Sequence, residues 1–143
     1  MVVFSTLGKF YTINCSRVSS GRGFGDPISL LIDKNDNEEI LFFQIYEQDK
    51  EFLITSSAGK GFFVNSNDFI ASTKSGKKVM NLKDNDRAVS CAEKKGDLIV
   101  SISGEKKSFK LLAFNSSEIP NMQKGRGVTL QKFKSGKTLN AFC

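Results

Sequence analysis

Three segments of this chain repeat one pattern, and this repetition restricts the fold more than any other feature of the sequence. The segments begin at Val2, Phe52 and Leu98. Each contains an apolar run, a Ser-x-x-Gly or Ser-Gly turn with lysine nearby, a second apolar run, a polar connection, and a glycine beside basic residues. The period of about 45–50 residues is the length of a four-stranded propeller blade, which can bury its faces only against neighbouring blades.

Glycines mark the turns of each repeat. We expect one set at hairpin turns, where the backbone needs a positive φ that glycine adopts without strain: Gly8, Gly59 and Gly104. A second set is expected where a polar loop enters a strand: Gly21, Gly76 and Gly125. By themselves these glycines indicate turns and nothing more.

The apolar runs are short, rich in valine, isoleucine and phenylalanine, and interrupted by Gly, Ser, Asn and Asp, as is typical of strands. No segment keeps the apolar spacing of an amphipathic helix over three turns, so few helices are expected. The sequence predicts one all-β domain, 1–143, with repeats at approximately 1–50, 51–96 and 97–143. The expected strands include Val2–Thr6, Phe10–Ile13, Ile28–Ile32, Ile40–Ile45, Phe52–Thr55, Gly61–Val64, Leu98–Ile102 and Phe109–Phe114.

The residue content argues against an enzyme. The chain has no histidine, and its three cysteines, Cys15, Cys91 and Cys143, have no C-x-x-C spacing. A disulfide framework and a zinc site are therefore not expected. Without histidine the commonest general base is missing. We expect no catalytic residue, no metal and no cofactor in this chain.

Three loops look like ligand-binding motifs, and each lacks an essential residue. Gly136-Lys137-Thr138 is the end of a phosphate-binding P-loop, but Gln131 stands where its first glycine belongs. The stretch 21–26, GRGFGD, is followed by Pro27 and a strand-like run instead of the helix of a dinucleotide-binding loop. The stretch 33–44 lacks the central glycine and the final glutamate of a calcium loop, so we interpret it as a solvated acidic turn.

The net charge is +6, which favours an anionic partner such as nucleic acid or a membrane surface. The charge is unevenly distributed. Residues 1–50 hold 5 basic against 7 acidic side chains, residues 51–96 hold 8 against 5, and residues 97–143 hold 8 against 3. The basic character therefore rises along the chain, and the first repeat is a poor place for DNA to approach.

Basic residues fall at matching turns of successive repeats. A run of lysines usually marks only a solvated face, but here glycines beside them let backbone N–H groups approach an anion. Stacked blades would place these turns on one rim as a curved basic track. Lys9 belongs to this pattern, and the candidate DNA-binding residues are Arg22, Lys60, Lys74, Lys77, Lys78, Lys106, Lys107, Lys124, Arg126, Lys132, Lys134 and Lys137.

Direct reading of bases is not expected. The sequence shows no recognition helix, and its phenylalanines occupy strand positions that a core would claim. Contact with duplex phosphates, weakly dependent on base sequence, is the natural inference.

Four stretches carry a resemblance to a known family: GRGFGDPISLLID, LITSSAGKGFFV, SGKKVMNL and EIPNMQKGRGVTLQKFKSGKT. With them the chain resembles the C-terminal domain of the bacterial topoisomerase IV A subunit, of the alpha-proteobacterial kind, over nearly its whole length. The gyrase A subunit is the near relative, marked by a Gln-Arg-Arg-Gly-Gly-Lys/Arg-Gly box. Residues 123–127, QKGRG, are a shorter and degenerate form of that box, which favours topoisomerase IV over gyrase-like wrapping.

The resemblance implies a β-pinwheel, in which propeller-like blades exchange outer strands and a basic perimeter binds and bends duplex DNA. Such a domain presents the transported DNA segment for decatenation or relaxation. Strand cleavage belongs to a tyrosine in the N-terminal part of the subunit, while ATP and magnesium belong to the holoenzyme. The family's domain usually has five or more blades, so about three blades imply a fragment whose ring is open or completed by another copy.

The implied partners are double-stranded DNA and, in the parent enzyme, the B subunit together with a second copy of the A subunit, with no small-molecule substrate. The expected location is the cytoplasm, in association with the nucleoid, with a peripheral position at the inner membrane left open for the parent enzyme. No signal peptide or long apolar run is found in the sequence. An alternative stays open: a protein-interaction propeller whose strand edges or acidic first repeat dock another subunit or a chromosome-organising protein.

Overall fold

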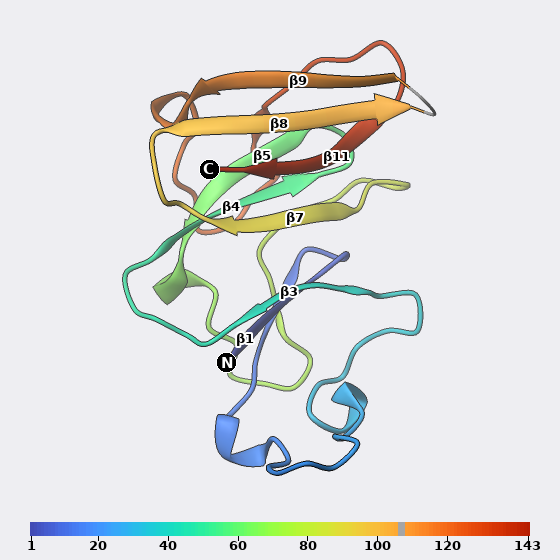
Figure 1. Cartoon of the computed structure of the whole chain (residues 1–143), viewed down its shortest axis with the longest axis vertical. Helices are drawn as coiled ribbons and strands as arrows, with labels where there is room; N and C mark the ends of the chain where they lie inside the picture. The colour runs from blue at the N-terminus through green and yellow to red at the C-terminus, as the bar shows by residue number, and fades with distance from the viewer. Residues whose placement is uncertain (106–107) are drawn as a thin grey trace.

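The computed structural model describes residues 1–105 and 108–143, which fold almost entirely into antiparallel strands (Figure 1). Three sheets follow one another along the long axis of the molecule, in the strand orders β3-β1-β2-β6, β10-β5-β4-β7 and β11-β8-β9. The prediction of an all-β fold with about three propeller-like blades in an incomplete ring is confirmed.

The elements are short. The first sheet contains β1 (Val2–Ser5), β2 (Lys9–Thr12), β3 (Ile40–Gln44) and β6 (Lys77–Lys78). The second contains β4 (Glu51–Ser56), β5 (Lys60–Asn65), β7 (Ala88–Glu93) and β10 (Val128–Thr129). The third contains β8 (Leu98–Glu105), β9 (Ser108–Asn115) and β11 (Lys137–Phe142). The 3-10 helices are η1 (Cys15–Arg17), η2 (Ile28–Leu30), η3 (Ser66–Asp68) and η4 (Ser116–Glu118).

Each later repeat gives one short strand to the preceding sheet. β6, from the second repeat, pairs with β2 so that Lys78 lies opposite Lys9. β10, from the third repeat, pairs with β5 so that Thr129 lies opposite Lys60. The stretch between η1 and β3 holds the same place in the first repeat, but it forms no strand. This exchange of outer strands is what the pinwheel resemblance implies.

The cores lie between successive sheets. Between the first and second sheets the ring of Phe69 stacks on Phe10 at 4.0 Å and meets Phe52 edge-on at 5.5 Å. A smaller cluster between the second and third sheets includes Leu53, Phe63 and Ile99. Each sheet therefore buries apolar side chains against its neighbours, as stacked blades require.

The outer face of the first sheet is covered by the first repeat itself. Ile32 is buried against Val3 and Tyr11, with η2 beside them. The Tyr11 O–H donates to Glu38 Oε1 at 2.8 Å, and the Asn35 N–H donates to Glu38 Oε2 at 2.9 Å. Burial, together with the bond to Glu38, raises the pKa of Tyr11, so this hydroxyl stays protonated and keeps donating.

Several expectations drawn from the sequence are wrong. Ile28–Ile32 is not a strand: its first residues form η2, which follows Pro27 and has no sheet to join. The acidic turn at 33–44 is not fully solvated, because Glu38 is buried and bonded. Gly104 lies within β8 opposite Phe109 and not at a turn. The phenylalanines are not all core residues, because the side chains of Phe24, Phe43 and Phe109 are exposed.

Replacing Gly127 by alanine should destabilise the fold by about 1–3 kcal/mol. Gly127 has a φ of 79°, and a Cβ there would press on the Gly61 carbonyl, where β10 joins β5. Chemical denaturation followed by circular dichroism measures this change. Gly96→Ala is the matched control, because a Cβ at Gly96 meets nothing within 4 Å; equal stability of the two variants would contradict the assigned role of Gly127.

Candidate nucleic-acid interface

The second strand of each hairpin carries a lysine at the same structural position: Lys9 on β2, Lys60 on β5 and Lys110 on β9. Each lysine lies five residues before an asparagine that caps a 3-10 helix. A strand rises about 3.4 Å per residue, so each lysine lies roughly 17 Å from its asparagine, near the hairpin turn. The fold therefore places one lysine per blade at an equivalent position, five residues before the capped end of its strand.

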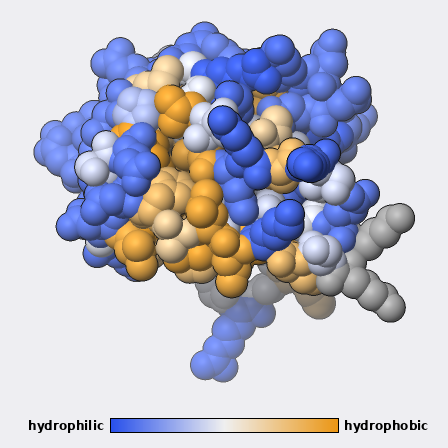
Figure 2. All heavy atoms as spheres, turned by 90° about the horizontal axis from the view of Figure 1, so that it is seen from above, coloured by the Kyte–Doolittle hydropathy of each residue, from blue (hydrophilic) through white to orange (hydrophobic). Residues whose placement is uncertain are grey.

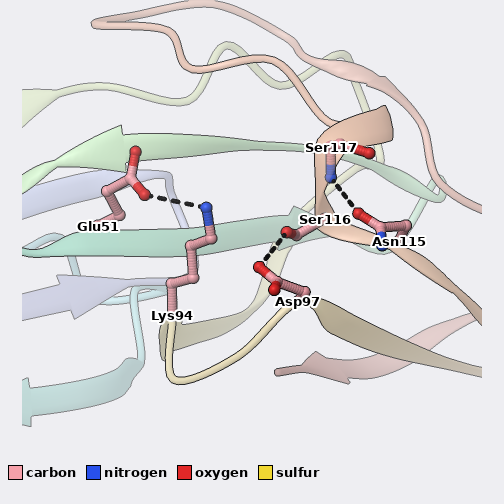
Figure 3. A network of polar contacts seen from close by, with 6 residues as sticks. All are labelled: Glu51, Lys94, Asp97, Asn115, Ser116 and Ser117. Atoms are coloured by element: carbon pink, nitrogen blue, oxygen red, sulfur yellow. Dashed lines mark hydrogen bonds and ion pairs between the residues drawn. The ribbon is translucent and has the colours of Figure 1, made fainter.

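The asparagine caps fix the other end of these strands. The Oδ1 atoms of Asn14, Asn65 and Asn115 accept the backbone N–H two residues further on, at 2.9–3.0 Å. Figure 3 shows the third cap, where Ser117 donates to Asn115 and Ser116 Oγ donates to Asp97 at 3.5 Å. Nearby, Lys94 and Glu51 form an ion pair at 3.1 Å. The asparagine caps end the second strand of each hairpin at the same residue type, so each lysine lies the same number of residues from a capped end.

The lysines lie where the exchanged strands join. Lys60 Nζ donates to Thr129 Oγ1 on β10 at 2.6 Å. Lys9 Nζ reaches the Ser75 carbonyl at 3.5 Å, just before β6, and Lys78 lies directly opposite Lys9. Lys110 is exposed on β9, beside which the described residues place no exchanged strand. Lys9 and Lys60 therefore lie beside exchanged strands, and Lys110 lies at the equivalent position of the third hairpin.

A groove joins the second and third blades on this side. It has a volume of about 620 Å³ and runs between residues 110–112 of β9 and residues 129–132 after β10. Lys110 and Lys132 line it, and so does Thr129, the partner of Lys60. The groove therefore contains two basic side chains of the third repeat, and Lys60 of the second repeat contacts its edge through Thr129.

The predicted residues of the first sheet gather at its outer edge. Lys77 and Lys78 form β6, and Lys74 lies just before it. Lys77 Nζ donates to the Asp68 carbonyl at 2.5 Å, and Lys74 Nζ contacts the Leu30 carbonyl at 3.4 Å. Arg22 lies apart from them, on an exposed stretch that joins no sheet.

The predicted residues of the third repeat divide between places. Arg126 and Lys137 line a cavity of about 390 Å³ together with Lys83, Asp84 and Asp86. In it, Arg126 Nε and Asp86 Oδ2 are buried and have no hydrogen-bond partner among residues 1–105 and 108–143. Lys124 and Lys134 occupy exposed loop positions, and Lys132 lines the groove beside Lys110. Lys106 and Lys107 lie outside the described residues.

The sequence interpretation missed Lys110. In that interpretation Gly104 is equivalent to Gly59, so Lys106 and Lys107 occupy the position equivalent to Lys60. The third hairpin is longer than the second. Its outermost pair is Leu98 with Asn115, whereas the outermost pair of the second hairpin is Glu51 with Asn65, which are closer in sequence. The Lys-x-x-x-x-Asn spacing common to all three hairpins is the signal that identifies Lys110.

A second set of equivalent positions, one in each repeat, changes from an acidic to a basic residue along the chain. The Thr6 N–H donates to the carbonyl of Glu39, and the equivalent Ser57 N–H donates to that of Arg87. Lys137, at the start of β11, holds the corresponding place in the third repeat. The charge at this position thus changes from negative to positive along the stack, and Arg87 Nη1 reaches back to the Asn37 carbonyl at 3.0 Å.

Other chemistry finds little support. Within residues 1–105 and 108–143, no group of three or more His, Cys, Asp or Glu side chains is placed to hold a metal. Burial raises the pKa of the Cys91 thiol well above its ordinary value, which keeps it unreactive. No helix in this part of the chain is long and apolar enough to cross a membrane.

Comparison with known proteins gives consistent matches. The family described as DNA gyrase C-terminal domain, beta-propeller, matches residues 50–92 and 113–140. The A subunit of DNA topoisomerase 4 from Rickettsia bellii is 47% identical over 142 residues, which are 98% of this chain but 18% of that protein. The chain therefore spans about a fifth of the length of the curated relatives that it matches.

Solved structures share the fold. The E. coli ParC C-terminal domain superposes with a TM-score of 0.87 and 21% identity, over 99% of this chain and 60% of that one. A DNA gyrase A C-terminal domain superposes with a TM-score of 0.75 and 26% identity, over 99% of this chain and 46% of that one.

Proposed function

Because this chain belongs to the family of C-terminal domains of topoisomerase IV and gyrase A subunits, we propose that it is a non-catalytic module that binds and bends duplex DNA. The observation that carries the proposal is the recurrence of one lysine per blade at Lys9, Lys60 and Lys110, each beside an exchanged strand or the place for one. The module needs no cofactor of its own.

The spacing of the blades suits a phosphate backbone. Packed sheets lie about 10 Å apart, so lysines at equivalent positions recur at about that distance or more on the outer side. Along the helix axis each DNA strand carries one phosphate per about 3.4 Å, so lysines that recur about 10 Å apart along the axis would be separated by about three phosphates. Lys78 beside Lys9 and Lys132 beside Lys110 add charge to the same track.

Phosphate contact explains why base-reading elements are not needed. Lysine ammonium groups act as point charges that position a duplex without reading its sequence. A curved track also rewards bending of the duplex, which costs on the order of 1–6 kcal/mol for a site of a few tens of base pairs. Few contacts must offset that cost here, so binding should be in the micromolar range and sensitive to salt.

In the parent enzyme, we propose, this module presents the DNA segment that is transported during decatenation or relaxation. Cleavage and ATP hydrolysis then reside in the parts of the A and B subunits that this chain does not span. Its assembly partners are the B subunit plus a second copy of the A subunit, and its location is the nucleoid. This assignment rests on the similarity to A subunits of DNA topoisomerase 4.

Binding to DNA should weaken steeply with salt. If about six phosphates are contacted, the log–log slope of the association constant against salt is near −5, at roughly −0.9 per contact. Fluorescence anisotropy of a labelled duplex of roughly 40 base pairs across a salt series measures this slope, with a single strand of the same length as comparison. A flat response, or equal affinity for both DNA forms, would argue against a duplex-phosphate track.

Replacing single lysines should show whether DNA binds at the equivalent lysines of the blades or elsewhere on the surface. Lys60→Gln and Lys110→Gln should each make the salt slope shallower by about 0.9, because each removes one phosphate contact. Lys95→Gln is the matched control, since Lys95 is exposed on the turn between β7 and β8, away from the lysine ends of the hairpins. An unchanged slope for Lys110→Gln, or an equal change for the control, would show that DNA does not bind at the equivalent lysines Lys9, Lys60 and Lys110.

A further inference from the structure

A cavity between the second and third repeats holds charged side chains that the equivalent lysines of the blades do not include. Its volume of about 390 Å³ lies within the usual range of small-molecule sites. The hairpin turn after β4 and the loop before β7 line it from the second repeat, and the loops before β10 and β11 line it from the third. Most of its lining residues are charged or polar, unlike the end of the molecule where β9 lies, on which apolar side chains gather (Figure 2). Three of the lining residues are basic, Lys83, Arg126 and Lys137, and two are acidic, Asp84 and Asp86.

Backbone hydrogen bonds fix both sides of this cavity. On the side of the third repeat, the Gly125 N–H donates to the Val79 carbonyl at 3.0 Å, and the Asn81 N–H donates to the Gly125 carbonyl at 2.7 Å. These bonds hold Arg126, the next residue, against the second repeat. On the other side, the Asp86 N–H closes its own turn by donating to the carbonyl three residues earlier at 3.0 Å. The charged side chains are therefore presented from fixed backbone, as a preorganised site requires.

Two buried atoms in the cavity, one donor and one acceptor, are left open. Asp86 Oδ1 accepts from the Ser57 hydroxyl at 2.7 Å and from the Ala58 N–H at 3.0 Å, which fixes the carboxylate. Asp86 Oδ2 and Arg126 Nε are buried, and among residues 1–105 and 108–143 neither has a hydrogen-bond partner. Buried polar groups are nearly always hydrogen-bonded. An open donor and an open acceptor in one cavity therefore indicate a ligand that bonds to both.

The two open atoms require a ligand that both accepts and donates. An arginine N–H can only donate, and an ionised carboxylate can only accept. Inorganic phosphate and phosphate monoesters satisfy both, because they carry charged oxygens and, at a pH of about 6, many of them keep a P–OH group. Lys83 and Lys137 add positive charge for the other phosphate oxygens. Sulfate and the phosphodiesters of DNA carry no such proton, so each would place an acceptor against Asp86 Oδ2.

We propose that this cavity binds a phosphate group that still carries a proton, either inorganic phosphate or the terminal phosphate of a nucleotide, and rejects the phosphodiesters of a DNA backbone. Arg126 Nε donates to one phosphate oxygen, and Asp86 Oδ2 accepts from the P–OH group. Held between loops of two repeats, the phosphate stabilises the packing of the second blade on the third. Arg126 and Lys137 then serve this site and not the track of equivalent lysines. The inference does not depend on DNA binding.

Isothermal titration calorimetry of the 143-residue chain at a pH of about 6 tests the proposal. Inorganic phosphate should bind at least about tenfold more tightly than sulfate, because only phosphate donates to Asp86. Dimethyl phosphate, a diester without a P–OH group, should not bind. Binding of adenosine 5′-monophosphate as well would assign the site to a nucleotide, and binding of inorganic phosphate alone would assign it to the free ion. Equal binding of phosphate and sulfate, or no binding of phosphate, would overturn the proposal.

A variant of the donor tests the same site. Arg126→Gln should weaken phosphate binding at least about tenfold, because it removes a charge-assisted hydrogen bond. Lys124→Gln is the matched control, since it makes the same change of charge two residues away, at an exposed position that does not line the cavity. An equal loss in the two variants would overturn the proposal, because it shows general attraction by surface charge.

A variant of the acceptor should change which anion binds. In Asp86→Asn, Oδ1 can keep its bonds to Ser57 and Ala58 while an amide N–H takes the place of Oδ2. Sulfate should then bind about as tightly as phosphate, because the new donor meets an acceptor on either anion. A preference for phosphate that survives this change would contradict the assigned role of Asp86. Circular dichroism verifies the fold, and the comparison of Arg126→Gln with Lys124→Gln decides the proposal even where Asp86→Asn does not fold.

Discussion

Backbone pairing between β6 and β2, and between β10 and β5, is the interaction on which the rest of this structure depends. Each blade has two apolar faces and only three strands from its own repeat, so it needs a neighbour both to bury its faces and to cover its outer edge. The strand from the next repeat covers the outer edge. It also holds the blade that carries it against the apolar face of the preceding blade. Gly76 and Gly127 allow the close approach, each with a positive φ beside the strand that it crosses.

The same exchange aligns the charges. A lysine stands next to each exchanged strand because it lies five residues before the asparagine that caps the far end of its strand. Two basic side chains of the third repeat, Lys110 and Lys132, then line one groove together with Thr129, which accepts a hydrogen bond from Lys60 of the second repeat. The function follows from stacking more than from any single pocket, which agrees with the weak match of every loop to a small-ligand motif.

Much of this could be predicted from the sequence because the repeat and the strand pattern are local features. The runs at Phe52–Thr55 and Gly61–Val64 are continuous and apolar, and they form the central hairpin. β7 and β11 were missed because AVSCAE and KTLNAF mix polar and apolar residues, as strands covered on only part of their surface do. Lys110 was missed because the repeats were matched by their glycines, and the hairpin turns differ in length. The asparagine caps lie at equivalent positions and identify Lys110. Glu38 looked solvated because its partner Tyr11 is distant in sequence.

The claim that one end of the hairpins binds DNA can be tested residue by residue. Nuclear magnetic resonance spectra of the ¹⁵N-labelled chain, titrated with a short duplex, report which backbone amides change their environment. The account predicts shifts at Lys9, Lys60 and Lys110 and along β6 and β10, with little change at Ser16, Asn67 and Ser117 beside the asparagine caps. Shifts confined to the capped ends, or to the strands β3, β7 and β11, would contradict it.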